Sequence, residues 1–509
     1  MIRYFDVLRV FFLSFFLTLL MPNIGSLAKP KNIFSKDLSS LKVSNKSENN
    51  DLKINLNLDN LEDVFKKNNE EIRIFKSKIE QAKSDFKSQL ALWYPKLILK
   101  STNLPSYVSG QSSSNKTSEN NLTDTFTKSL DINLEWDLID FSRNPNIKVS
   151  KLNLDKAKLI YKIKYRELYK EILEIFLKFK SSNEEIKVAK QAIALSEISL
   201  KDAMDRFKAG IGNKLEVLEA DTQLRKDQKF LARKIGDVKK NKNLLIYKLN
   251  LNNKDVVLDE SKLNISGIWT TSINSSLEMT INQREEFKNL KIDQLINKNN
   301  RYLKTSVMKP KVSIYNTYSI STITGESGVV SPDTSKSTQS EENTVGLKFS
   351  WTLFDGGKTR QNYKSSKEKE KELEINFSVV QEQIINDIRN QFIDLDVSMK
   401  NILKSYQQII FAQEALDLSL MRLKAGATNQ REVIRNLSEL TDSKRKYIQD
   451  VTNYNINIEK LKLDTGIKKI DDCNYFIEKK VTFLKNDIYE DINEELLKNI
   501  CQNNILEKL

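Results

Sequence analysis

The second half of the chain repeats the first half at an offset of 215 to 216 residues, and this repeat limits the possible folds more than any other feature. Four landmarks recur in the same order: a Leu-Glu pair, a proline segment, an alternating segment that ends in aspartate, and a glycine turn. They occupy residues 61–62 and 277–278, 93–97 and 308–312, 135–140 and 350–355, and 206–210 and 422–426. A period this long indicates a duplicated supersecondary assembly rather than a solenoid of small units. We therefore expect two copies of one fold over residues 56–252 and 276–466, joined by a segment over residues 253–275.

The N-terminus carries the features of a secretory signal peptide. Arg3 and Arg9 precede a short apolar run that ends at Ala28, within a small-x-small cleavage pattern. Because the run is too short to span a bilayer, we predict a signal peptide over residues 1–28 and a polar linker over residues 29–55. No cysteine follows the run, so a lipid anchor is not expected.

The composition argues against an enzyme and against nucleic-acid binding. The chain has no histidine, no metal-ligand spacing, no nucleophile elbow and no glycine-rich phosphate loop, so we expect no catalysis and no cofactor. Its charged residues, with a net charge of +14, are spread along helical faces, which indicates solvated helix surface. Cys473 and Cys501 lie in a polar tail over residues 467–509, and the sequence leaves open whether they form a disulfide.

Two long stretches without proline or glycine predict unusually long helices. They cover residues 147–208 and 362–424, and each helix would be about 90 Å long at 1.5 Å per residue. Apolar residues in them recur at helical or heptad spacing, which predicts coiled-coil packing. Two shorter helices are expected beside each long one, over residues 58–92 and 215–249 in the first copy and 277–307 and 431–463 in the second. Each short pair is slightly longer than its long neighbour, so the two short helices can be stacked end to end along it.

An alternating segment in each copy predicts a β-strand. The apolar positions are Leu130, Ile132, Leu134, Trp136 and Leu138 in the first copy, and Val345, Leu347, Phe349, Trp351 and Leu353 in the second. About ten residues with a period of two is typical of a transmembrane strand with one face to lipid and one to a wet lumen. A half-buried strand of a soluble sheet gives the same pattern.

The positions of aromatic residues favour transmembrane strands over strands of a soluble sheet. Hairpin geometry would place Trp93, Tyr94 and Trp136 at one level, with Trp351 and Phe354 supplying the same level in the second copy. Such a band is typical of a membrane interface. Between the paired strands, the polar residues 106–125 and 321–343 predict long exposed loops.

Four strands per chain are too few to close a membrane barrel, because the smallest such barrels need about eight. The strands therefore predict an oligomer, either a dimer with a filled eight-stranded barrel or a trimer with twelve strands and an open lumen. A trimeric coiled-coil spacer or adhesin of the envelope would explain the helices alone, but not the two alternating hairpins.

Together these features resemble the TolC-like outer-membrane efflux protein family over roughly residues 55–466. The matching motifs are Tyr-Pro-x-Leu at residue 94, Trp-x-Leu-Phe-Asp-Gly-Gly at residue 351, and the two glycine turns that begin at Arg206 and Arg422. The resemblance implies an α+β membrane protein: a homotrimer with a transmembrane β-barrel in outer-membrane lipid, continuous with a long α-helical coiled-coil barrel, the periplasmic tunnel.

The resemblance also implies a function and partners. The chain would be the exit duct of a tripartite efflux pump or type I secretion system. Its partners would be a periplasmic adaptor (membrane fusion) protein and an inner-membrane transporter of the ABC or RND type. The sequence does not indicate the cargo.

The glycine turns predict the tips of two helical hairpins. Gly210, Gly212 and Gly426 suit helix ends, where a left-handed residue is often needed. The resemblance implies that the adaptor docks at these tips and that the tunnel closes there.

Charged residues just past each turn match the positions of gate carboxylates in the family. They are Glu216 and Glu219 in the first copy and Glu432 in the second, while Arg435 replaces an acidic residue. A ring of carboxylates would favour cations at the constriction. Glu216 and Glu432 also fit an Asn-x-x-Glu capping box, and Glu432 is placed to pair with Arg435, so both roles stay open.

Overall fold

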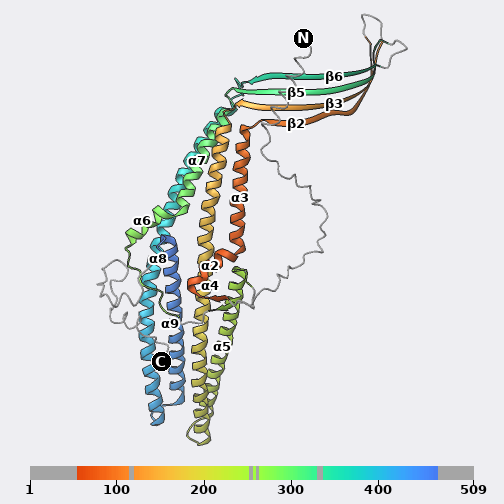
Figure 1. Ribbon diagram of the computed structural model, residues 1–509. Helices are drawn as coiled ribbons and strands as arrows, with labels where there is room; N and C mark the ends of the chain where they lie inside the picture. Colours follow the sequence, from red (N-terminus) through yellow and green to blue (C-terminus); the bar gives the residue numbers. More distant parts are fainter. Residues whose placement is uncertain (1–53, 114–119, 252–255, 259–262, 330–335, 468–509) are drawn as a thin grey trace. The chain divides into compact units, whose positions relative to one another are not determined.

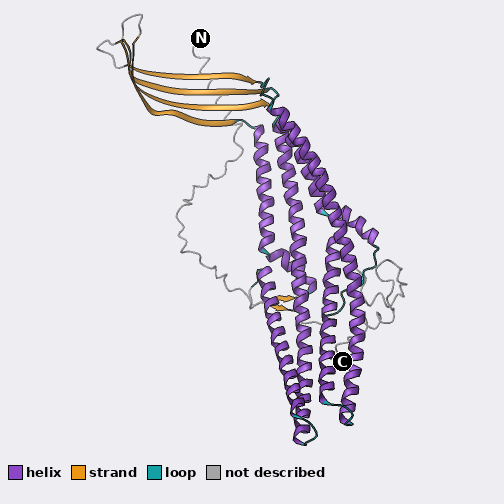
Figure 2. Cartoon of the chain, turned by 180° about the vertical axis from the view of Figure 1, so that it is seen from behind, coloured by secondary structure: helices purple, strands orange, loops and turns teal. Residues whose placement is uncertain are grey.

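The computed structural model describes residues 54–113, 120–251, 256–258, 263–329 and 336–467, drawn as ribbons in Figures 1 and 2. The predicted signal peptide, nearly all of the polar linker, and the C-terminal tail with both cysteines lie outside these ranges.

The described elements form two similar series along the chain. The first series is β1 (Ile54–Leu56), α2 (Leu58–Asn68), α3 (Glu70–Leu90), the short 3-10 helix η2 (Ala91–Trp93), β2 (Lys96–Ser113), β3 (Asn120–Ile139), α4 (Arg143–Lys208) and α5 (Lys214–Lys248). The second is β4 (Val256–Leu258), α6 (Ile273–Gln283), α7 (Glu285–Ser306), β5 (Lys311–Val329), β6 (Lys336–Ser350), α8 (Lys358–Lys424) and α9 (Gln430–Thr465). Among the helices in these series, none has both the length and the apolar character needed to cross a bilayer.

Each long helix lies beside two shorter ones, as the sequence predicts. Figure 1 shows α3 and α5 along α4, and both pack against it; α7 and α9 pack in the same way against α8. The two series also contact each other, because α4 packs against α7 and α9 while α5 packs against α9. The predicted arrangement of stacked short helices beside a continuous one is confirmed.

Apolar side chains at helical spacing form a buried core in each series. In the first, Ile172 and Phe176 of α4 are buried with Leu245 of α5. In the second, Ile388 of α8 is buried with Tyr454 of α9. Each such side chain contributes about 1.5–3 kcal/mol when it leaves water, so these seams hold the long hairpins together.

Two helices predicted to be continuous are broken. Residue 69 separates α2 from α3, and residue 284 separates α6 from α7, with extended backbone at both points. Asn69 caps α3 by accepting a hydrogen bond from the Ile72 N–H at 2.8 Å. Arg284 makes no side-chain cap to α7. The prediction of continuous helices through the ranges 58–92 and 277–307 was therefore wrong at these two positions.

The four long strands form one antiparallel sheet in the order β2-β3-β5-β6, which Figure 2 shows in orange. The central pair keeps one register from residue 121 to residue 137 of β3, with Leu134 opposite Asn316 and Leu130 opposite Ile320, and shifts between Asp137 and Ile139. Strands β2 and β6 each have one strand neighbour within this sheet. The sheet therefore ends in two open edges within the described part of the chain.

The observed strand boundaries differ in two ways from those predicted from the sequence. Strands run through most of residues 106–125 and 321–343, which were expected to be loops, because a backbone ladder does not require apolar side chains. Strand β6 ends at Ser350, so Trp351 and Leu353 lie beyond it. The partner of Ser350 is Lys311, the first residue of β5, and Pro310 before it has no backbone N–H to continue the pairing.

Candidate functional site

One face of the four-stranded sheet is apolar and open. Leu347 on β6, a member of the alternating apolar set, is 70% exposed, and Leu97 on β2, opposite Leu134 of that set, is 69% exposed. Leu130, Ile132 and Leu138 on β3 are also exposed. A soluble sheet buries such a face against a core, whereas a membrane barrel turns it to lipid.

The opposite face is polar and hydrogen-bonded from strand to strand. Ser313 donates its hydroxyl to Asp137 at 2.7 Å, and Thr317 donates to Asn133 at 2.8 Å. Gly346 on the same face leaves room for a tyrosine, since an added Cβ would lie 2.7 Å from the Tyr315 ring. An apolar outside and a hydrogen-bonded polar inside are the two surfaces that a water-filled barrel wall needs.

The predicted interfacial aromatics make the same contact in both copies. Trp136 donates its indole N–H to the backbone carbonyl of Trp93 at 3.0 Å, and Trp351 donates to the carbonyl of Met308 at 3.0 Å. Tyr94 and Phe354 are 70% and 83% exposed beside these contacts in the sequence. The structure thus brings Trp136 to Trp93 and gives Trp351 the equivalent contact to Met308, while the location of the five aromatics at a membrane interface stays a prediction.

A second aromatic level was missed in the sequence. Tyr107 on β2 and Phe126 on β3 pack with ring centroids 4.7 Å apart, on the same face as the apolar set. Phe126 precedes Trp136 by ten residues along β3, which corresponds to about 25 Å across a membrane for a strand tilted by about 40°. Phe126 lies on the even-numbered face of this strand, but Lys128 interrupts the apolar alternation between Phe126 and Leu130, so the pattern did not extend to it.

The two hairpin tips have the same backbone design. Gly210 and Gly426 adopt left-handed φ values of 75° and 71°, directly after the ends of α4 and α8. In the first tip, Gly210 N–H donates to Phe207 O and Ile211 N–H donates to Arg206 O, both at 3.1 Å. The second tip has equivalent bonds, which define a Schellman motif in each copy. Gly212 has no left-handed backbone and instead packs closely against Arg206.

The candidate gate glutamates lie at the starts of α5 and α9. Asn213 accepts a hydrogen bond from the Glu216 N–H at 2.9 Å, and Asn429 accepts one from the Glu432 N–H at 3.2 Å. The capping role of the two asparagines is confirmed. The carboxylates differ, since Glu216 Oε2 is buried without a hydrogen-bond partner while Glu432 pairs with Arg422 at 3.1 Å. Glu432 thus pairs across the hairpin with Arg422 rather than with Arg435.

An ion pair that the sequence did not suggest joins the two tips. Arg431 at the start of α9 binds Glu219 of α5 at 2.9 Å, and this hydrogen-bonded carboxylate raises the pKa of Arg431. Two of the three candidate carboxylates, Glu219 and Glu432, are therefore matched by arginines within the chain. No local pattern marks this contact, because its partners are 212 residues apart.

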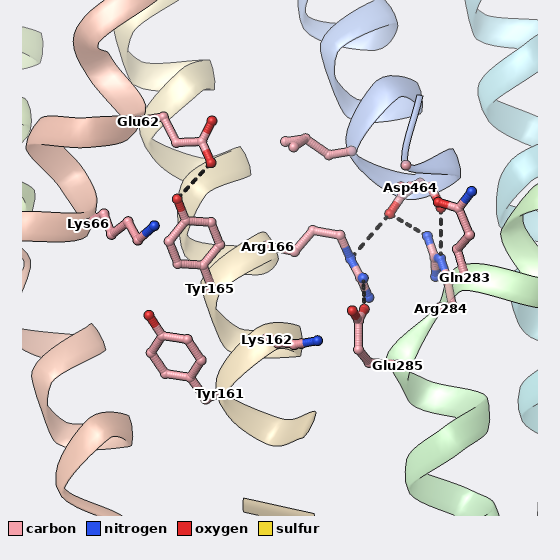
Figure 3. A pocket seen from close by; sticks show the side chains of 12 residues that line it. Glu62, Lys66, Tyr161, Lys162, Tyr165, Arg166, Gln283, Arg284, Glu285 and Asp464 are labelled. Atoms are coloured by element: carbon pink, nitrogen blue, oxygen red, sulfur yellow. Dashed lines mark hydrogen bonds and ion pairs between the residues drawn. The ribbon is translucent and has the colours of Figure 1, made fainter. Parts of the chain in front are cut away.

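A buried charged cluster joins the two copies further along the helices. Arg284, Lys170 and Gln391 all contact the carboxylate of Asp464, and Arg166 of α4 binds Glu285 at 2.7 Å and also Glu286. Figure 3 shows Arg166 and Arg284 directed at Asp464 from different elements. A cavity of about 360 Å³ lies beside the cluster, with Tyr161 and Lys162 also on its wall. Because cations and carboxylates pair with one another there, the cluster joins helices rather than forming a reaction centre.

Electrostatics in this cluster favour the charged forms of Asp464 and Arg166, whereas burial lowers the pKa of Lys170. Burial raises the pKa of Asp464, but the charges of Arg284 and Lys170 outweigh that effect and hold the pKa below its usual value. Burial would lower the pKa of Arg166, whereas Glu286 and Glu285 raise it. Asp464 is therefore ionised, and its negative charge compensates the positive charges of the neighbouring cations.

Comparison with protein-family models gives one match. The model described as "Outer membrane efflux protein" matches residues 63–248 and 304–466, and these ranges contain the strand β6, the two tips and all four candidate gate residues. None of the curated proteins that were compared matches the chain.

Solved structures of membrane proteins, two of them outer-membrane channels, share the fold. A membrane protein from Pseudomonas aeruginosa is similar with a TM-score of 0.67 and 13% identity, over 87% of this chain and 99% of that chain. The CmeC outer membrane channel of Campylobacter jejuni gives a TM-score of 0.65 and 14% identity, over 87% and 94%. The MtrE outer membrane channel of Neisseria gonorrhoeae, solved in an open state, gives a TM-score of 0.61 and 10% identity, over 80% of this chain and 88% of that chain.

Proposed function

Since the chain belongs to the outer membrane efflux protein family, we propose that it forms the exit duct of a tripartite efflux pump or a type I secretion system. The chain lies in the outer membrane with a large periplasmic helical part. One observation supports conduction most directly: a single sheet has an open apolar face, a hydrogen-bonded polar face and two open edges. A spacer or adhesin built only from coiled coils has no use for such a sheet.

Three copies would complete the duct. Joining the β6 edge of one chain to the β2 edge of the next gives twelve strands, and the polar faces would then line a lumen wide enough for water. The paired α4–α5 and α8–α9 hairpins would continue this wall as the periplasmic tunnel. Closing the edges in this way also removes unpaired strand groups from lipid.

The tips would supply the gate and the adaptor site. Glu216, Glu219, Glu432 and Arg435 would surround the constriction, and Gly210, Gly212 and Gly426 would shape the surface for a periplasmic adaptor protein. Several apolar side chains at the first tip are exposed, which suits a helical partner: Phe207, Ile211, Leu215 and Leu218. An inner-membrane transporter of the ABC or RND type would supply energy, and the duct itself would carry out no chemistry.

Conductance in planar bilayers tests this proposal. Purified protein should give discrete channels whose occurrence parallels the amount of trimer measured by mass in detergent. A protein that is trimeric but produces no channels would be a spacer, and the duct proposal would be wrong. A monomer that stays in solution without detergent would also contradict it.

A further inference from the structure

A lysine interrupts the apolar face of strand β3. Lys128 stands two residues before Leu130, on the same face as Ile132 and Leu134. Its side chain is exposed, and it forms no ion pair with any residue that the structure describes. A lysine that faces lipid costs about 2–4 kcal/mol at the midplane of the bilayer but only about 0–1 kcal/mol near an interface. The depth of Lys128 therefore determines how well lipid tolerates it.

Lys128 lies near the end of the sheet that is far from the helices. Strand β3 continues into α4 shortly after Trp136, so Phe126 marks the far end, which in an outer-membrane barrel is the outer side. Lys128 is eight residues from Trp136 and two from Phe126, or about 20 Å and about 5 Å along the membrane normal for a strand tilted by about 40°. Lysine side chains at such a depth extend their ammonium groups into the polar region. The ammonium of Lys128 can therefore reach the head groups of the outer leaflet.

Lys128 begins a polar row that crosses three strands. It lies opposite Thr322 of β5, and Thr322 lies opposite Gln339 of β6, with no shift of register around these pairs. Residues directly opposite each other share one face of a sheet, so an ammonium, a hydroxyl and a carboxamide face outward together. Lys128 and Gln339 are exposed, and Thr322 is half-buried. Along β3, the row is bordered by Phe126 on one side and by Leu130 on the other.

A carboxylate lies on the same face at the other side of this row. Glu341 is two residues from Gln339 on β6 and lies opposite Ile320 of β5. It is exposed and forms no ion pair within the described strands. Strand β5 separates Lys128 from Glu341, so they are about 10 Å apart across the sheet. A ligand with an anionic group at one end and hydroxyl groups at the other would satisfy both side chains.

We propose that this part of the sheet binds the head group of a phosphorylated glycolipid of the outer leaflet. A phosphate group would pair with Lys128, which suits lysine as a compact point charge. Sugar hydroxyl groups would form hydrogen bonds with Thr322, Gln339 and Glu341, and the acyl chains would lie along the apolar rows that begin at Leu130. This inference rests on the proposed membrane barrel and specifies what its outward face binds.

The width of the site favours a glycolipid over a free anion. Its polar groups extend over two strand spacings, about 10 Å, and one phosphate ion cannot contact both ends. A free phosphate also gains nothing from Leu130 and Ile320, which border the polar groups and are apolar. A lipid without a sugar would pair with Lys128 but would leave Gln339 and Glu341 without hydrogen-bond partners.

Lipid binding to the purified trimer tests the role of the lysine. Native mass spectrometry would count the molecules of lipid A, a phosphorylated glucosamine lipid, bound to each trimer. Lys128→Gln should weaken this binding about fivefold, as expected for one lysine at an anionic membrane surface, whereas Lys128→Arg should preserve it. Lys348→Gln is the matched control, because Lys348 is also exposed but lies on the polar face opposite Ser313, and it should have no effect.

A double variant tests the hydrogen-bonding half of the site. Thr322→Val with Gln339→Leu makes the outward face more apolar, so a face that meets only hydrocarbon should be unaffected or stabilised. Binding of lipid A should nevertheless become weaker. Binding of phosphatidic acid, which carries a phosphate but no sugar, should stay unchanged.

The outcomes separate this inference from the proposed function. Weaker binding of lipid A by Lys128→Gln and by the double variant, with no change in Lys348→Gln, supports the site. Equal binding by all variants overturns the site, and trimers that still conduct ions would leave the duct intact. Displacement of lipid A by an equal concentration of inorganic phosphate would indicate a site for free anions and would overturn the glycolipid as its ligand.

Discussion

Asn69 and Arg284 stand 215 residues apart at equivalent points of the two copies, and they perform the same structural role with different chemistry. Each breaks a helix with nearly the same backbone angles, φ −66° and ψ 123° at Asn69 and φ −62° and ψ 129° at Arg284. Each also donates a side-chain hydrogen bond to the last turn of the equivalent helix. Asn69 Nδ2 lies 2.6 Å from Lys248 O, and Arg284 Nε lies 3.3 Å from Asp464 O.

Replacing Asn69 tests how much this junction contributes to stability. Asn69→Ala removes the cap on α3 and the bond to Lys248, so we expect a loss of about 1–2 kcal/mol. Thermal unfolding followed by circular dichroism should show a lower midpoint. Asn243→Ala, at an exposed position inside α5, should leave the midpoint unchanged or raise it slightly because alanine is the better helix former. Equal behaviour of the two variants would mean that the break at residue 69 is not held by its side chain.

The long helices were predictable because their signal is repeated many times. Ile172, Phe176 and Phe179 carry a helical period whose buried face the structure confirms. The breaks at Asn69 and Arg284 were not predictable, since a single asparagine or arginine inside a helix costs only a fraction of a kcal/mol. What stabilises them is a hydrogen bond to a residue about 180 positions away.

The candidate gate shows the same division between local and distant contacts. The left-handed Gly210 and the cap at Asn213 depend on neighbours within five residues, and the sequence indicates both. Arg431 contacts Glu219 only because two hairpins lie side by side, so its role emerges from the structure alone.

Asp464 should be the most sensitive single carboxylate of the helical body. Asp464→Asn would deprive the buried Arg284 and the partly buried Lys170 of this counter-charge, and breaking a buried pair from one side costs about 3–5 kcal/mol. The unfolding midpoint at neutral pH should fall clearly. Glu368→Gln removes an ion pair whose side chains are 71% and 65% exposed, so it should change little.

The pH dependence of this effect has a definite sign. The folded protein lowers the pKa of Asp464, so its stabilising contribution is complete above the unfolded pKa of about 3.9 and disappears as the pH falls through the folded value. The difference in midpoint between the native chain and Asp464→Asn should therefore be constant near neutrality and shrink in acid. A difference that grows in acid would show that Asp464 is not held as an anion.

The two faces of the sheet should respond oppositely to a lysine. Ile132→Lys places a charge on the apolar face between the levels of Phe126 and Trp136, where it costs about 2–4 kcal/mol in lipid. Thr344→Lys, on the polar face opposite Thr317, should be tolerated because a lumen is wet. Recovery of each variant from outer membranes measures the difference. Equal recovery would contradict the assignment of the apolar face to lipid.

Charge at the tips should set the ion selectivity of the duct. Arg435→Glu replaces one positive charge per chain with one negative charge, and Arg431→Gln removes one positive charge while releasing Glu219 from its pair. Both should move the reversal potential of a reconstituted channel toward cations, with the larger shift for Arg435→Glu if its side chain faces the constriction. Lys240→Gln, at an exposed position on α5 farther from the tip, is the control for a simple change in net charge and should shift the potential little. If Arg435→Glu behaves like this control while Arg431→Gln does not, the constriction is formed by the Glu219–Arg431 level, and the two tips contribute to it unequally.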